Sequence, residues 1–196
     1  MASSDFTDAL APHYNDALRY CHALTARTAR IEAEDILQEA LLKALNHYDQ
    51  LKTPSRFRVW FFQIITRTYL SERRKAYWKR ILPFASGVMH MPDVYASVPL
   101  SDVHLALLDA LAQLAPRQRA ALLLFELAGF SLEEIRLIQG DRSLSAVKSR
   151  LSRARQKLKH IIQEDKNAAS KNTSLSRLHH ETIETTRKAL DALHDR

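Results

Sequence analysis

Several features that define other protein classes are scarce or absent in this chain. Cys21 is the only cysteine among the 196 residues, so neither an intrachain disulfide nor a cysteine-based metal site can form. No apolar run approaches the roughly 18 residues that a membrane-spanning helix needs. Residues 1–10 also lack the basic and then apolar pattern of a secretory signal. We therefore expect a cytoplasmic protein that does not insert into membranes.

Sequence patterns of catalysis are missing as well. The chain has three glycines, and no glycine-rich phosphate loop, nucleophile elbow or paired-carboxylate signature occurs in it. The nine histidines are scattered, and the adjacent pair, His179 and His180, would project from different faces of a helix. We predict no catalytic residue, no metal site and no cofactor.

Strand-like alternation is nearly absent, whereas helical periodicity extends through most of the chain. The fold class that follows is all-α. The periodicity predicts helices over about 5–26, 32–48, 56–80, 101–114, 116–127, 131–139, 143–165 and 175–193. In the helix over 32–48, the predicted apolar face consists of Ile36, Leu37, Ala40, Leu41, Ala44 and Leu45.

Composition changes abruptly between these helices. Residues 81–100 contain three prolines, one glycine and a single charged residue, Asp93, which indicates a linker. Residues 166–174 are polar and indicate a hinge before a last, weakly amphipathic helix. We therefore predict a small helical domain over residues 1–80, a linker over 81–100, a second small helical domain over 101–165 and an extension over 166–196.

Positive charge is concentrated in two segments. The formal net charge is +7, and residues 66–80 carry six basic side chains against one acidic side chain. Residues 117–160 carry ten basic side chains against four acidic ones. Two local concentrations of this kind are typical of a protein with a polyanionic partner.

Residues 131–159 have the pattern of a helix-turn-helix. Ser131 can cap a short amphipathic helix, which Gly140 and Asp141 then end. Ser143 or Ser145 can cap a second, basic helix. The apolar positions of this second helix recur at three- and four-residue intervals and predict one buried stripe, made by Val147, Leu151, Ala154, Leu158 and Ile161.

The other side of this second helix carries a mixture of basic and small polar side chains: Lys148, Ser149, Ser152, Arg153 and Gln156. Arginine and lysine donate to guanine edges in a major groove, and Ser and Gln adapt to several bases. A solvated basic surface helix would show the same charges, but the caps and the turn favour DNA binding.

The predicted helix over 56–80 interleaves aromatic and basic residues. Phe57, Trp60, Phe61, Ile64 and Ile65 should face a core. Aromatic side chains next to arginines can alternatively stack on nucleic-acid bases, which keeps a second role open for Tyr69, Tyr77 and Trp78.

Three segments resemble one known family in order. They are AEDILQEALLKAL over 33–45, FRVWFFQI over 57–64, and a third that combines LAPRQR over 114–119, the Glu134-Ile135 pair and VKSRLSRAR over 147–155. They resemble the extracytoplasmic-function group of bacterial RNA polymerase sigma factors, which carry a sigma-two and a sigma-four domain. The resemblance covers residues 5–165.

The resemblance implies a function and partners. A member of this group binds the polymerase core, through the clamp helices of the largest subunit and the flap, and directs it to promoter DNA. An anti-sigma factor is a further candidate partner. Asp35 and Glu39 share a helix face, bordered by Glu34, and these three residues are the expected contacts with polymerase.

The resemblance also assigns DNA contacts. In sigma-four, Lys148, Ser149, Ser152 and Arg153 are expected at the bases of the minus-thirty-five element. Near phosphates we expect Arg142, Arg150 and Arg155. In sigma-two, the expected contacts with the melted minus-ten element are Arg56, Arg58, Trp60, Arg67, Arg73, Arg74 and Lys75.

The chain departs from the family pattern in its third helix. Where the family commonly shows Asn, then Asp, then Arg, this chain has Arg67, Ser71 and Arg74, which puts specific minus-ten readout in question. Two other functions stay open, the first of them because of these missing residues. One is a sigma-like decoy that occupies an anti-sigma factor, and the other is an autonomous helix-turn-helix regulator.

Overall fold

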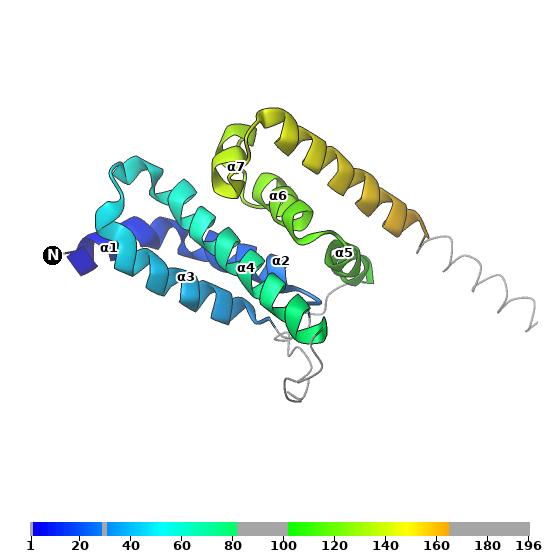
Figure 1. Ribbon diagram of the computed structural model, residues 1–196, viewed down its shortest axis with the longest axis horizontal. Helices are drawn as coiled ribbons and strands as arrows, with labels where there is room; N and C mark the ends of the chain where they lie inside the picture. Colours follow the sequence, from blue (N-terminus) through cyan, green and yellow to red (C-terminus); the bar gives the residue numbers. More distant parts are fainter. Residues whose placement is uncertain (1, 29–30, 82–101, 165–196) are drawn as a thin grey trace, which may run out of the picture. The chain divides into compact units, whose positions relative to one another are not determined.

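The computed structural model describes residues 2–28, 31–81 and 102–164, and within these ranges the secondary structure is helical, without strands. The all-α prediction is confirmed. The first part contains α1 (Ala2–Leu10), η1 (Ala11–His13), α2 (Tyr14–Thr25), α3 (Ala33–His47), η2 (Tyr48–Gln50), η3 (Pro54–Arg56) and α4 (Phe57–Ile81). The second contains α5 (Asp102–Ala112), α6 (Pro116–Glu126), α7 (Leu132–Gln139) and a helix over residues 144–164, called the basic helix below (Figure 1).

Some of the predicted segments lie outside the residues that the structure describes. Residues 82–100 of the predicted linker lie outside the described residues, as does the whole predicted extension over 166–196 with its hinge and last helix. None of the described helices combines the length and the apolar character that crossing a membrane requires.

The single helix predicted over residues 5–26 is wrong. The chain forms α1 and α2 separately, with a 3-10 turn at Ala11–His13 between them. Pro12 lies in this turn, and proline has no N–H to continue an α-helical hydrogen-bond ladder and clashes with the preceding turn. The bounds predicted for α3 and α4 agree with the structure to within about one residue.

Helices α2, α3 and α4 pack together around an aromatic core. Phe57, Phe61 and Ile65 are buried as predicted, and Trp60 and Ile64 are half-buried at the edge of this core. The Tyr20 hydroxyl of α2 lies 3.0 Å from the hydroxyl of Thr66 in α4, which satisfies two buried polar groups.

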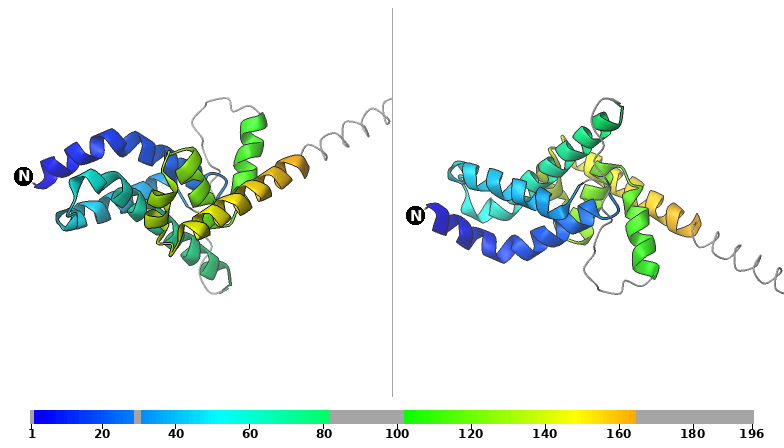
Figure 2. Two further views of the ribbon diagram at one scale, coloured as in Figure 1. Left: turned by 90° about the horizontal axis from the view of Figure 1, so that it is seen from above. Right: turned by 90° about the horizontal axis from the view of Figure 1, so that it is seen from below.

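The second part of the chain packs α6, α7 and the basic helix around aliphatic side chains and Phe130. Val147, Leu151 and Ala154 are buried, which confirms the predicted stripe along the basic helix up to Ala154. The basic helix is continuous over residues 144–164 (Figure 2).

The described residues up to Leu158 belong to one compact unit. Within it, α2 contacts α6, and α4 contacts both α6 and α7. The two predicted domains therefore pack directly against each other.

Candidate nucleic-acid and partner interfaces

The first helix of the helix-turn-helix, α7, has well-formed ends. Ser131 accepts a hydrogen bond from the N–H of Glu134 at 3.3 Å, and the Glu134 carboxylate accepts one from the N–H of Ser131 at 2.8 Å. This reciprocal pair is a capping box. Gly140 ends the helix in the left-handed conformation at φ +66°, which glycine adopts without steric cost. Both predicted ends are confirmed.

The turn after α7 is held by a buried polar network. Arg150 donates through Nη2 to Oδ1 of Asp141 at 2.7 Å and through Nη1 to the side-chain oxygen of Gln139. The side chains of Arg150 and Asp141 are only 13% and 6% exposed. Gln139 in turn donates to the carbonyl of Arg117 at 3.1 Å. The network joins α6, α7 and the basic helix, so it sets the angle between the two helices of the motif.

The role predicted for Arg150 has to be corrected. Arg150 was expected near DNA phosphates, but its guanidinium faces Asp141 and Gln139 inside the domain. Because the carboxylate of Asp141 already occupies this guanidinium, Arg150 positions the basic helix. Sequence periodicity could not reveal this, since the partner lies in the turn.

The outward face of the basic helix carries the side chains that the sequence predicted for it. Lys148, Ser149, Ser152 and Arg153 are exposed. Arg142, in the preceding turn, is exposed as well. The Ser143 hydroxyl accepts a hydrogen bond from the N–H of Ala146 at 3.2 Å, which identifies Ser143 rather than Ser145 as the cap.

Arg155 lies beside this face but has partners within the domain. It pairs with Glu126 at 2.7 Å, and its guanidinium lies 5.1 Å from the centre of the Phe125 ring. Both charged side chains are about half exposed, and an exposed ion pair of this kind contributes about 0–1 kcal/mol. Such a weak pair leaves the guanidinium able to exchange Glu126 for a phosphate.

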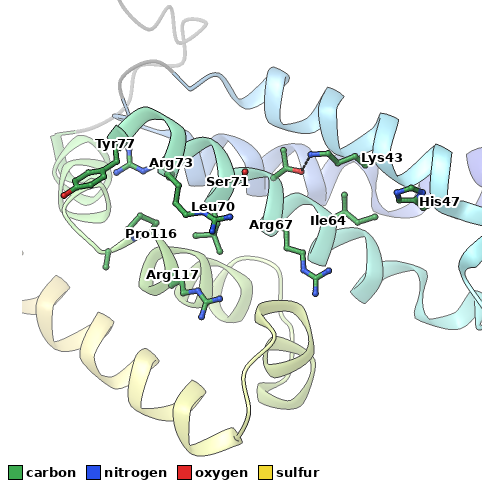
Figure 3. A pocket seen from close by; sticks show the side chains of 13 residues that line it. Lys43, His47, Ile64, Arg67, Leu70, Ser71, Arg73, Tyr77, Pro116 and Arg117 are labelled. Carbon is green, nitrogen blue, oxygen red and sulfur yellow. Dashed lines mark hydrogen bonds between the residues drawn. The ribbon is translucent and has the colours of Figure 1, made fainter. Parts of the chain in front are cut away.

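A second basic surface lines a cleft of about 1130 Å³ along α4 (Figure 3). Within the described residues, its lining contains no Asp or Glu. Arg67, Arg73 and Arg74 form no ion pair or hydrogen bond with the described part of the chain. The cleft therefore combines several uncompensated positive charges with apolar walls. Its cationic side chains are those of Lys43, Arg67, Arg73, Arg74 and Arg117.

The other residues predicted for the minus-ten element lie at the start and near the end of α4. Arg56 is exposed, and Trp60 is half-buried against Phe57. Arg58 donates to the carbonyl of Ala128 and lies 4.1 Å from the centre of the Phe130 ring. Lys75 is exposed and pairs with Glu72 at 2.6 Å, which raises the pKa of Lys75. Arg58 is thus covered by the second half of the chain.

An acidic surface runs along α3. Glu34, Asp35 and Glu39 are exposed, as predicted. Glu39 pairs with Lys43 at 2.9 Å, and Glu34 lies 3.5 Å from His22. The acidic residues are therefore on the surface and are not needed to complete the core.

Exposed leucines extend this acidic surface. Leu45 was expected in the core, but it is 46% exposed, and Leu42 is 53% exposed. Leu42 also lines a shallow pocket of about 480 Å³ together with Asp35 and Glu39. Sequence reasoning missed Leu42, although its spacing of three residues from Glu39 places both on one helix face. An apolar side chain among carboxylates suits a protein partner with basic residues around an apolar spot.

The described residues offer little for covalent or metal chemistry. Cys21 is fully buried, and burial raises the pKa of its thiol to about 12, so it stays protonated and unreactive at neutral pH. No group of three or more His, Cys, Asp or Glu residues that could hold a metal ion occurs in the described ranges.

Comparisons with known proteins agree on one family. The family models Sigma-70 region 2 and Sigma-70, region 4 match residues 10–79 and 104–158. The sigma factor EcfG of Rhodopseudomonas palustris, described as an extracytoplasmic-function RNA polymerase sigma factor, is 34% identical over 136 residues. That alignment covers 68% of this chain and 72% of EcfG.

A longer relative and one solved structure agree with this family, and a second solved structure shares the fold. SigG of Mycobacterium tuberculosis is 30% identical over 80% of this chain, but the chain spans only 48% of SigG. The sigma factor RpoE of Bartonella quintana, solved in complex with the anti-sigma factor NepR, is 29% identical with a TM-score of 0.63 and covers 81% of this chain and 97% of its own. CnrH, solved with the cytosolic domain of CnrY, shares the fold at 19% identity, with a TM-score of 0.56. The match covers 84% of this chain and 96% of the CnrH chain.

Proposed function

The chain belongs to the extracytoplasmic-function RNA polymerase sigma factors of the sigma-70 family, and from this premise we propose that it is a promoter-specificity subunit of bacterial RNA polymerase. It would act with the polymerase in the cytoplasm and contribute recognition rather than catalysis. The observation that carries the proposal is that one chain presents an exposed basic recognition helix, a basic cleft along α4 and an acidic, partly apolar face on α3.

The basic helix is proposed to read the minus-thirty-five element from the major groove. Lys148 and Arg153 have the donors for guanine edges, and the hydroxyls of Ser149 and Ser152 can donate or accept. Arg142 and Arg155 flank this face and are proposed to contact phosphates, which adds affinity without sequence preference. The buried stripe and the Arg150–Asp141 pair hold the opposite side of the helix in place.

The cleft along α4 is proposed to hold the melted strand of the minus-ten element. Arg67, Arg73 and Arg74 supply positive charge that a phosphate backbone can neutralise. Arg56, Arg58 and Trp60, at and just before the start of α4, are further proposed contacts with this strand. Lys75 is proposed as a contact as well, although it lines the pocket beside Asp35 and Glu39 rather than this cleft. Extruding a base from the duplex costs a few kcal/mol, which stacking on an aromatic side chain such as Trp60 can offset.

The acidic face of α3 is proposed to bind the clamp helices of the polymerase largest subunit, through Glu34, Asp35 and Glu39, with Leu42 as an apolar contact. The sigma-four domain would contact the flap. The complex of RpoE with NepR supports an anti-sigma factor as a further partner of this chain.

The sequence departure in α4 supports a second candidate function. Arg67 and Ser71 replace the Asn and Asp that the family commonly uses, and a chain without minus-ten readout could serve as a decoy for an anti-sigma factor. The exposed, well-positioned base-reading face of the basic helix favours the sigma factor over the decoy.

Dependence on polymerase separates these functions. The full chain is mixed with a promoter fragment, with and without core polymerase, and DNA binding is measured by fluorescence anisotropy. A sigma factor gives tight, sequence-dependent binding that requires core polymerase. An autonomous regulator binds tightly without core polymerase, and a decoy gives no sequence-dependent binding in either case.

A further inference from the structure

The cleft along α4 has the size and the lining of a small-molecule site. Its volume is about 1130 Å³, and its walls come from α3, α4 and α6 (Figure 3). Sites for small molecules in proteins have volumes of roughly 300–1000 Å³ and combine apolar walls with a few polar groups that orient the ligand. A cleft just above this range accommodates a ligand that is built from several linked groups.

A row of arginines forms one side of the cleft. Arg67 and Arg74 are seven positions apart in α4, which is about two helical turns, so they lie on the same helix face. Both side chains are exposed, and neither forms an ion pair or a hydrogen bond with the described part of the chain. A guanidinium presents a planar fork of N–H donors that can bind two phosphate oxygens at once. The row is therefore suited to more than one phosphate group.

Arg73 lines the same cleft and has an unused donor. Its side chain is half-buried, and its Nε is buried without a hydrogen-bond partner among the described residues. Native structures seldom leave a buried donor without an acceptor. A phosphate oxygen is an acceptor of the kind that this guanidinium lacks.

The wall from α6 adds a fourth arginine. Arg117 is exposed, and its Nη2 donates to the carbonyl of Gln139 only at 3.5 Å, which is longer than the usual range for an N–H donor. Lys43 contributes less, because it already pairs with Glu39 at 2.9 Å, outside the cleft. Four arginines without a carboxylate partner match the several negative charges of a triphosphate chain. A single small anion would leave most of them uncompensated.

Apolar side chains continue the cleft beyond the arginines. Tyr77 follows Arg74 by three residues on the same helix face, and it is 61% exposed. Figure 3 shows Tyr77 and Pro116 toward the end of the cleft that lies away from His47. An exposed aromatic ring can stack on a planar base of any sequence. The cleft thus places a polyanion-binding row next to an aromatic side chain, which is the combination that a nucleotide requires.

We propose that the cleft along α4 is a binding site for a nucleoside triphosphate, which holds the phosphates on its four arginines and the base against Tyr77. The melted promoter strand is proposed to use the same arginines of α4, so the nucleotide and the strand exclude each other. This exclusion rests on the proposed function, whereas the nucleotide site does not. The nucleotide thereby lowers the affinity of the chain for single-stranded DNA.

Isothermal titration calorimetry of the full chain tests the site without DNA or polymerase. The probes are ATP, GTP, CTP and UTP, and the comparison compounds are sodium tripolyphosphate and adenosine. At least one nucleoside triphosphate should bind with one-to-one stoichiometry and at least about tenfold more tightly than either comparison compound, because the site uses both the charge and the base. Binding of none of the four, or binding no tighter than that of tripolyphosphate, would overturn the proposal.

Substitutions separate a built site from general attraction to a basic protein. Arg74→Ala should weaken nucleotide binding at least about tenfold, because hydrogen bonds to a charged group are strong. The matched control is Arg19→Ala, which removes an exposed arginine of α2 that does not line the cleft, and it should leave the affinity unchanged. Equal losses from the two substitutions would show that binding follows net charge alone and would contradict the proposal.

The aromatic end of the cleft has its own variant. Tyr77→Ser should weaken nucleotide binding but leave the affinity for tripolyphosphate unchanged, because the phosphates do not use the ring. Circular dichroism checks that the variants fold, and Arg67→Ala repeats the measurement if Arg74→Ala loses helicity. Unchanged nucleotide affinity in folded Tyr77→Ser would show that the base does not lie against this residue.

Competition tests the consequence for DNA. A labelled single-stranded oligonucleotide of about 12 residues is bound to the free chain and followed by fluorescence anisotropy. Nucleotide at about 100 times its dissociation constant should weaken oligonucleotide binding at least about tenfold, and undiminished binding would refute a shared site. Arg74→Ala should also weaken oligonucleotide binding. If it does not, the proposed minus-ten role of the cleft fails, and calorimetry still decides whether the nucleotide site exists.

Discussion

Arg150 and Asp141 form a buried ion pair across the turn of the helix-turn-helix, with Nη2 of Arg150 donating to Oδ1 of Asp141 at 2.7 Å. Removing one partner of such a pair leaves an uncompensated buried charge. Arg150→Ala should therefore lower the free energy of unfolding by about 3–5 kcal/mol. Urea denaturation measures this change, and the exposed Arg142→Ala should stay within about 0.5 kcal/mol of the unmodified chain. Equal stability of the two variants would argue against the positioning role of Arg150.

Arg153 and Arg155 are expected to affect DNA binding differently. Arg153→Ala should cost about 1–3 kcal/mol and relax the preference at one base pair of the minus-thirty-five element. Arg155→Ala should weaken binding to all sequences alike, because Arg155 is proposed to contact a phosphate and not a base. Binding of the polymerase complex to a set of single-base promoter variants distinguishes the two, and identical losses across that set for both substitutions would refute this assignment.

The α3 face should be needed for polymerase binding and not for folding. Asp35→Lys and Glu39→Lys should each strongly reduce retention of the chain on immobilised core polymerase, and Leu42→Ser should do so by removing the apolar contact. Because all three side chains are exposed, the melting temperature should change little. Asp8→Lys, an exposed charge reversal on α1, is the control. Retention equal to that of this control would show that the α3 face does not bind polymerase.

Burial of Cys21 should make stability depend on alkaline pH. The pKa of this thiol is raised from 9.0 to about 12, so between these values the unfolded chain releases a proton that the folded chain keeps. Its contribution to stability is complete below pH 9.0 and is lost as the pH rises toward about 12. Cys21→Ala should flatten the fall in the free energy of unfolding over this interval. A slope identical to that of the unmodified chain would contradict the assignment.

Much of the fold was predictable because local signals were strong. The Ser131 cap, the glycine at position 140 and the apolar spacing in the basic helix each follow from short-range chemistry, and the structure has them where they were expected. The break at Pro12 was missed because the surrounding residues favour helix on both sides of it. Leu45 was wrongly predicted to be buried because the apolar residues of α3 span a wider part of the helix surface than the neighbouring helices cover.

The long-range contacts could not be predicted from sequence patterns. Arg119 reaches acceptors more than ninety positions earlier in the chain, and Arg58 reaches a carbonyl seventy positions later. A basic side chain in a basic segment carries no sign of whether it will meet DNA, a carboxylate or a helix terminus. Arg150 and Arg153 illustrate this, since they are three positions apart but face a buried carboxylate and solvent respectively.

Run-off transcription tests the central claim most directly. Core polymerase is incubated with the full chain and a library of randomised promoter fragments, and the transcribed templates are sequenced. The account predicts transcripts only when the chain is present, from templates that share a minus-thirty-five motif, with that motif relaxed at one position by Arg153→Ala. Transcription that does not depend on the chain, or transcribed templates that share no motif, would contradict it.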